Sequence, residues 1–394
     1  MQRSPVALAF IALFAILVGV TVLGVAQNWP RTRTIPTPAS LRQPKLLKAH
    51  VVALRTMRCR VPGLKGCSLV TAQLDEGSDK GKRTAFRFGD TGGDVQLGLG
   101  DRVLVVKNQL PPGAVGGAGT ALERYSFADF QRGHPLLLLL FVFAVVVLVG
   151  GRFHGLRALA GLAASLATIV FFVIPAIVDG RSPLQVAGFG GLGVMLLTIP
   201  LVHGGGAKSI AACLGTAGAL LITLTLADVF THGAHLTGLT SDESLYLQAT
   251  SHVSIVGLLL AGMVIGSLGV LGDTTVTQAS TVLALRRANP GLGFGALVQH
   301  ATAVGRDHIA ATVNTLVLAY TGAALPTLII FSLAGTSLER GVTTEAVAEA
   351  VVATLVGSIG LILAVPATTA LAALLALHLP ERSLRHAHAH VHSH

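Results

Sequence analysis

Charged side chains are scarce in this chain. Only 12% of its 394 residues are Asp, Glu, Lys or Arg, whereas 52% are hydrophobic. So little charge cannot coat a globule of this length in water, which argues against a soluble fold. Aromatic residues are also few, at 5%, while glycine numbers 46. This composition fits helices that pack closely in a bilayer through small residues.

Motifs for catalysis and for cofactors are missing as well. No Ser, His and Asp residues stand at catalytic spacing. Residues 204–209 fail as a phosphate-binding loop because Ala207 replaces the glycine before Lys208. Residues 188–193 are glycine-rich but lie inside an apolar run with no strand before them. We therefore expect no enzyme activity and no cofactor.

Long apolar runs are what the chain does have. They predict a polytopic α-helical membrane protein with about eight transmembrane helices. The runs are residues 5–26, 135–150, 156–178, 184–202, 209–230, 252–271, 308–333 and 347–377. The first run lacks a small-x-small cleavage site, so an uncleaved anchor is favoured over a signal peptide.

The distribution of Lys and Arg predicts the orientation. With the amino terminus inside, the cytoplasmic side holds most of the basic residues of the short loops, and the short outer loops hold only Arg181 and Arg340. The inner set is Arg3, Arg152, Arg157, Lys208, Arg286, Arg287, Arg306, Arg382 and Arg385. The sequence thus predicts a multi-pass protein of the cytoplasmic membrane with both termini cytoplasmic.

Most of the net charge of +10 lies in one segment. Residues 27–134 hold 17 Lys or Arg against 8 Asp or Glu. This basic segment is expected outside the cytoplasm, where anionic lipid or an anionic envelope polymer is the expected partner. Nucleic acid is not expected, because few aromatic side chains are available to stack on bases.

Short strand-like runs separated by glycines fill the same segment. They indicate a small, OB-like extracytoplasmic β-barrel. The runs are residues 50–54, 69–74, 84–88, 95–97 and 102–106. Cys59 and Cys67 lie in one loop, and a disulfide between them is favoured over two free thiols on an oxidising side of the membrane.

These patterns divide the chain into five parts. Residues 1–29 form an anchor, residues 30–110 a β-rich domain and residues 111–134 a linker. Residues 135–380 form a seven-span helical domain, and residues 381–394 form a His-rich cytoplasmic tail.

Two polar stripes stand out among the later spans. Asp273, Thr277 and Ser280 fall on one face of a helix, and Asp307, Asn314 and Thr321 repeat at helical spacing further on. Such stripes commonly line an ion, proton or solute path. In the alternative reading the two aspartates cap helix starts, Arg306 pairs with one of them, and Asn314 is the buried polar group.

The segment between these stripes is ambiguous. Residues 274–303 are weakly amphipathic and broken at residues 289–291, which form a turn signal. The segment either lies along the inner membrane surface or re-enters the membrane.

Histidines occur in two places that could bind metal. Asp228, His232 and His235 lie after the fifth apolar run, where the alternative is an ordinary loop. The carboxy terminus alternates histidine with other residues, at His386, His388, His390, His392 and His394. This tail either binds divalent metal or is simply solvated.

Three stretches carry a family resemblance. They are residues 266–280, the Gly-Arg-Asp of residues 305–307, and residues 314–326 with Asn314 at their start. Together they resemble the YibE/F-like family of bacterial membrane proteins, and the resemblance extends over nearly the whole chain. It implies an amino-terminal anchor, an extracytoplasmic domain and a multi-span carboxy-terminal half.

Two functions are compatible with these features. The polar stripes favour a transporter or permease of a small solute or ion. The alternative is a non-transporting envelope or signalling protein whose basic outer domain binds an anionic partner. The oligomeric state is not indicated by the sequence.

Overall fold

The computed structural model describes residues 4–31, 45–59, 67–89, 97–108 and 124–378. The chain divides into two compact units. One unit comprises residues 37–146 and contains the strands, so it is called the β unit. The other comprises residues 1–36 and 147–394 and is called the helical unit.

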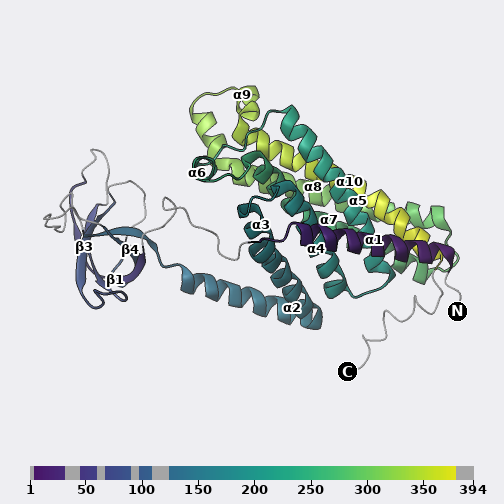
Figure 1. The fold of residues 1–394 in the computed structure, drawn as a ribbon, viewed down its shortest axis with the longest axis horizontal. Helices are drawn as coiled ribbons and strands as arrows, with labels where there is room; N and C mark the ends of the chain where they lie inside the picture. Colours follow the sequence, from purple (N-terminus) through teal and green to yellow (C-terminus); the bar gives the residue numbers. More distant parts are fainter. Residues whose placement is uncertain (1–3, 32–44, 60–66, 90–96, 109–123, 379–394) are drawn as a thin grey trace. The chain divides into compact units, whose positions relative to one another are not determined.

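The β unit is a curled antiparallel sheet of five strands in the order β3-β2-β1-β4-β5 (Figure 1). The strands are β1 (Leu46–Thr56), β2 (Ser68–Leu74), β3 (Arg83–Phe88), β4 (Arg102–Lys107) and β5 (Tyr125–Phe130). Alternate residues of β1 point inward, which buries Leu47, Ala49 and Val51 in the core of the unit. The described strands form a half-barrel and not the closed small barrel that was expected.

Aromatic side chains hold the two edge strands of this sheet near each other. Phe88 of β3 and Phe127 of β5 have ring centroids 4.9 Å apart, in an edge-to-face arrangement. Phe130 adds a further edge-to-face contact with Phe127 at 5.2 Å. Strands β3 and β5 share no backbone ladder, because they are the two edges of the sheet. The packing of aromatic rings therefore brings these two edges together.

Four of the five predicted strands are present, and the fifth lies elsewhere. Residues 95 and 96 fall outside the described residues, and Leu97 is not in a strand. The fifth strand is β5, within the stretch assigned from the sequence to a linker. Its alternating aromatic pattern was overlooked because a glycine-rich segment precedes it, although Val105 of β4 pairs with Phe127.

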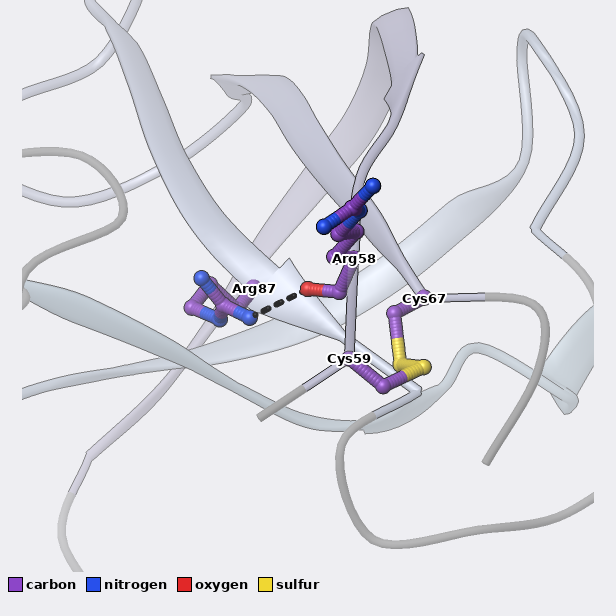
Figure 2. The surroundings of a disulfide bond; sticks show 4 residues. All are labelled: Arg58, Cys59, Cys67 and Arg87. Carbon is purple, nitrogen blue, oxygen red and sulfur yellow. Dashed lines mark hydrogen bonds between the residues drawn. A yellow bond between two sulfur atoms is a disulfide. The ribbon is translucent and has the colours of Figure 1, made fainter. Parts of the chain in front are cut away.

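A disulfide joins Cys59 to Cys67 across the connection from β1 to β2, with the two Cα atoms 5.2 Å apart. Beside it, the Met57 amide donates to the Cys67 carbonyl at 2.9 Å and extends the ladder of β1 and β2. Figure 2 shows the Arg87 guanidinium donating to the Arg58 carbonyl at 3.1 Å close to the bridge. Strands β1, β2 and β3 are thus tied together at this end of the sheet.

The helical unit is built from long apolar helices (Figure 1). The elements are α1 (Pro5–Gln27), α2 (Gly133–Thr168, of which residues 133–146 belong to the β unit), the π-helical η2 (Ile169–Val173), α3 (Ile174–Val178), α4 (Pro183–His203), α5 (Ala207–Gly233), α6 (Asp242–Thr250), α7 (Ile255–Ala288), α8 (Phe294–Leu333), α9 (Leu338–Thr343) and α10 (Glu345–Leu377). Helices α5, α7 and α10 pack against one another, α4 lies against α7, and α8 lies against α10.

Seven helical segments of the described chain are long and apolar enough to cross a membrane. One of them, Gly133–Val178, is interrupted at Arg152, where φ is 48° and ψ is −125°. The chain turns back so tightly there that a Cβ on Gly155 would lie 2.2 Å from the Val147 carbonyl oxygen. The eight runs of the sequence and the seven segments differ only because this segment contains two of the runs.

Residues 274–303 form the end of α7, a turn, and the start of α8. The break falls at the predicted turn, where the Gly291 amide donates to Asn289 Oδ1 at 3.0 Å and Arg286 Nη1 donates to the Leu292 carbonyl at 2.9 Å. Leu283 and Leu297 bury against α1, α4, α5 and α10.

One carboxylate connects three parts of the β unit. Asp79, in the turn after β2, accepts hydrogen bonds from Lys107 at 2.9 Å, Lys82 at 2.8 Å and Tyr125 at 2.6 Å. The bond from Lys107 first, then those from Lys82 and Tyr125, hold the pKa of Asp79 well below its usual range. Asp79 thus ties this turn to the end of β4 and the start of β5.

This contact makes the β unit sensitive to acid. The pKa of Asp79 is lower in the folded state than in the unfolded state. The contribution of Asp79 to the stability of the β unit is therefore complete above the ordinary carboxyl pKa of about 4, and it is lost as the pH falls below that value. We expect Asp79→Asn to lower the hydrogen-exchange protection of β4 and β5 at pH 7 and to reduce the further loss seen on acidification. Glu76→Gln, which alters an exposed pair at 3.7 Å, is the matched control. Equal protection in the two variants would contradict the assignment.

Candidate functional site

The two polar stripes predicted from the sequence do not meet in a buried interface. On α7 the Asp273 side chain is 73% exposed, and Thr277 and Ser280 are half-buried. On α8 the four predicted residues are all exposed: Arg306, Asp307, Asn314 and Thr321. The expectation that Asn314 is buried is therefore wrong, because α8 packs on α10 and α7 through its other side.

The capping alternative is also wrong for both aspartates. Asp273 lies in the middle of α7 and Asp307 in the middle of α8, far from either helix start. Sequence reasoning placed helix boundaries here because the apolar runs end, whereas the helices continue. Neither aspartate forms an ion pair with Arg306 among the described residues.

Asp273 lines a cavity of about 360 Å³ inside the helical unit. The walls come from the end of α2, η2, α4 and α7, and they are mostly small or aliphatic side chains. Gly190 and Gly191 of α4 and Gly269 and Gly272 of α7 are among the lining residues, so side chains leave space at this crossing. A volume near this size is at the small end of the range for ligand sites.

The polar side chains of the cavity differ in whether they already form hydrogen bonds within the protein. The hydroxyl of Ser165 donates to the Gly161 carbonyl at 3.0 Å, and that of Thr198 donates to the Val194 carbonyl at 2.7 Å. Both donors are satisfied by their own helix. Asp273 and His203 are the titratable side chains of the lining. The chemistry available to a solute here is therefore that of one carboxylate and one imidazole.

A second histidine reaches Asp273 from α8. His308 Nε2 lies 3.8 Å from Asp273 Oδ2, beyond hydrogen-bond distance. This nitrogen is buried and has no hydrogen-bond partner among the described atoms. Sequence reasoning missed both His203 and His308. Each ends or begins an apolar run, where a histidine looks like a boundary residue.

A buried polar seam runs between α5, α7 and α10, separate from the cavity. Thr216 and Thr275 share a hydrogen bond of 2.6 Å, and the Thr369 hydroxyl lies 3.0 Å from Gln278 Oε1. Four buried side-chain atoms of these helices have no hydrogen-bond partner in the part of the chain that the structure describes: Thr274 Oγ1, Gln278 Nε2, Ser358 Oγ and Thr368 Oγ1. Unpaired buried polar atoms are costly, so they mark this seam as unusual.

Most hydroxyls of the helical unit are satisfied without crossing to a neighbouring helix. They donate to a carbonyl three or four residues earlier on their own helix, as Thr216 does to Ala212 and Thr223 to Ala219, both at 2.9 Å. Thr369 donates to the Val365 carbonyl at 2.7 Å. These bonds let hydroxyls lie inside helix contacts at little cost.

Gln278 was overlooked as a site residue because the predicted stripe of Asp273, Thr277 and Ser280 lies on another face of the same helix. Its side chain is fully buried. It lies against α8, where Gly305 leaves room for its amide. The signal that would have found it is a lone amide in a helix of apolar and hydroxyl residues.

The predicted group of Asp228, His232 and His235 does not form a metal site in the part of the chain that the structure describes. His232 Nδ1 bonds the Asp228 carbonyl at 2.8 Å and lies 3.4 Å from Asp228 Oδ1. His235 adopts a positive φ of 53° in the turn after α5. No three His, Cys, Asp or Glu side chains among the described residues gather as metal ligands would. The histidines of the predicted tail, from His386 to His394, lie outside the described residues.

The contact between Gly305 and Gln278 gives a test of the seam. A methyl group at Gly305 would lie 2.6 Å from Gln278 Nε2 and 2.7 Å from Val365 Cγ1. We expect Gly305→Ala to destabilise the helical unit by about 1–3 kcal/mol through overpacking. Gly322→Ala is the control on the same helix, because a Cβ there meets nothing within 4 Å. Thermal unfolding in detergent compares the two, and equal midpoints would contradict this packing.

Comparison with known proteins identifies the helical unit. A family model described as YibE/F-like protein matches residues 139–378. No curated protein and no solved structure matches the chain. The match leaves out α1 and the strands, so the family assignment depends on the helical unit and not on nearly the whole chain. Because the matched range covers more than half of the sequence and runs from α2 to α10, the chain belongs to the YibE/F-like protein family.

Proposed function

We propose that the helical unit lies in a membrane as a permease for a small cation, protons included, and that Asp273 takes part in its path. The observation that carries the proposal is the cavity of about 360 Å³ with this carboxylate in its lining. Carboxylates inside membrane helix bundles are expensive and commonly mark ion or proton pathways. A single carboxylate in a mostly apolar cavity favours a cation over an anion.

The long apolar helices support the membrane part of the proposal. Many of their outward side chains are large and apolar, including Leu221, Leu318 and Leu355. Surfaces of this kind are stable in lipid and would aggregate in water. The basic residues at the His203 end of the helical unit, such as Lys208 and Arg287, favour that end as the cytoplasmic one.

Histidine next to the carboxylate extends the proposal to coupling. His308 Nε2 has no hydrogen-bond partner among the described residues and lies 3.8 Å from Asp273 Oδ2, so a proton on His308 would create an attractive pair between α7 and α8. A cation at Asp273 and a proton on His308 would then compete for the same carboxylate. Such competition is one way for a permease to couple two ions.

Flux measurements test the role of Asp273. The full-length protein is reconstituted in vesicles, and uptake of protons, Na⁺ and K⁺ is followed with ion-sensitive dyes. We expect Asp273→Asn to lower flux by roughly tenfold or more, as loss of a charge-assisted contact would. Asp307→Asn is the matched control: it changes the same chemical group on α8, and Asp307 is not part of the cavity lining.

Two results would overturn the permease proposal. One is flux by the wild-type protein equal to that of empty vesicles for every ion tested. The other is equal loss in Asp273→Asn and Asp307→Asn, because a path through the cavity distinguishes these two carboxylates.

A second candidate function concerns the β unit. A hollow of about 830 Å³ is lined by Lys48, Arg102, Arg132 and His134, together with Asp75. Arg132 is neutralised by Asp129 at 2.7 Å, and His50 bonds Asp75 at 2.7 Å. Arg102 has no side-chain partner among the described residues. This observation favours an anionic group, such as a lipid phosphate, as the ligand of the hollow.

Binding to immobilised anionic lipid separates this candidate function from the permease function. We expect Arg102→Gln to weaken binding of the full-length protein in detergent micelles to immobilised anionic lipid, with ion flux unchanged. Arg83→Gln, on the edge strand β3, removes the same charge away from the hollow and serves as the control. Equal binding by both variants would exclude the hollow as the binding site.

A further inference from the structure

One face of α8 has an unusual pattern of exposed residues. Asp307, Asn314 and Thr321 repeat every seven residues along α8. Between them, Ala311, Leu318 and Leu325 complete an alternating spacing of four and three residues. All six side chains are exposed. This is the spacing of a heptad seam, in which one helix packs lengthwise against another.

This exposed face of α8, called the α8 seam, has no partner within the described part of the helical unit. Only Leu297, Ala301 and Gly305, near the start of α8, are buried. The apolar window of α8 has none of its residues buried, whereas the corresponding window of α5 is 56% buried. Helix α8 therefore presents most of its length outward.

Exposure of this face to lipid would leave the polar amide of Asn314 without a hydrogen bond, which is energetically unfavourable. Its amide has no hydrogen-bond partner among the described residues. The adjacent Thr315 differs, because its hydroxyl donates to the Ala311 carbonyl at 2.9 Å. An amide both donates and accepts, so two copies of Asn314 can satisfy each other across a two-fold axis. Asparagine at such a position is known to set the register and number of paired helices.

Charge and size on the same face fit a second copy of this chain. Arg306 and Asp307 are adjacent, exposed and without an ion-pair partner among the described residues. Across a two-fold axis, Arg306 of one copy can meet Asp307 of the other, which is charge complementarity within one surface. Ala311, a small residue of this face, allows the two backbones to approach, as small residues do in membrane helix pairs.

We propose that the α8 seam pairs with the same seam of a second copy, in parallel, to form a homodimer. The seam comprises Asp307, Ala311, Asn314, Leu318, Thr321 and Leu325. The proposal is independent of the permease function, since none of these residues lines the cavity.

Crosslinking in vesicles tests the contact directly. Leu318→Cys places a thiol on the seam, and Leu221→Cys places one on α5; the two leucines are 63% and 65% exposed. The native cysteines do not interfere, because Cys59 and Cys67 are bonded and Cys213 is buried. The variants are reconstituted at a low ratio of protein to lipid and mildly oxidised. On a non-reducing gel, we expect Leu318→Cys to migrate at twice the chain mass and Leu221→Cys to migrate as a single chain.

A second pair of variants tests the chemistry of the seam. We expect Asn314→Leu to raise the dissociation constant of the dimer in lipid by about threefold or more, measured by energy transfer between labelled copies. Thr315→Val should leave it unchanged, because that hydroxyl is satisfied within α8. Equal crosslinking of the two cysteine variants would overturn the dimer, with lipid or another partner covering the face. An unchanged constant in Asn314→Leu would overturn the pairing of the amides.

Discussion

Close approach of α5, α7 and α10 is the constraint on which the helical unit depends. A Cβ on Gly215 of α5 would lie 2.0 Å from Thr368 Oγ1 of α10, and one on Gly360 of α10 would lie 2.1 Å from Thr223 Oγ1 of α5. Contact at this distance requires glycine on one helix and a compact side chain on the other. Such fitted contacts bring the backbones close enough for van der Waals packing to hold the helices together.

The cavity and the packed helices are two results of the same composition. Where glycine faces a threonine, as at Gly215, the helices close completely. Where the glycines of α7 line the cavity, at Gly269 and Gly272, a Cβ would meet nothing within 4 Å, and space is left. The β unit obeys different rules, because strand register, aromatic edges, a disulfide and the Asp79 contacts stabilise it. The helical unit is thus stabilised by close helix contacts, and the β unit is stabilised by these other interactions.

The sequence predicted the architecture well and the site only in part. Apolar runs, strand alternation and the Asn289–Gly291 turn are local signals, so helices and four strands were placed correctly. Asp273 was found because its spacing to Thr277 and Ser280 puts the three side chains on one helix face. Its neighbours His203 and His308 were not, since they come from other helices and no local pattern joins them. The exposure of Asn314 was also unpredictable, because helical spacing defines a face but not what that face contacts.

Threonine in these helices has a further consequence. A hydroxyl bonded only to its own helix, as in Thr223 or Thr354, requires no hydrogen-bond partner on the neighbouring helix. Contact between two helices through such a side chain depends on shape, as the fit of Thr223 of α5 against Gly360 of α10 shows. The relative position of the helices at this contact is therefore set by side-chain volume and not by the direction of a hydrogen bond.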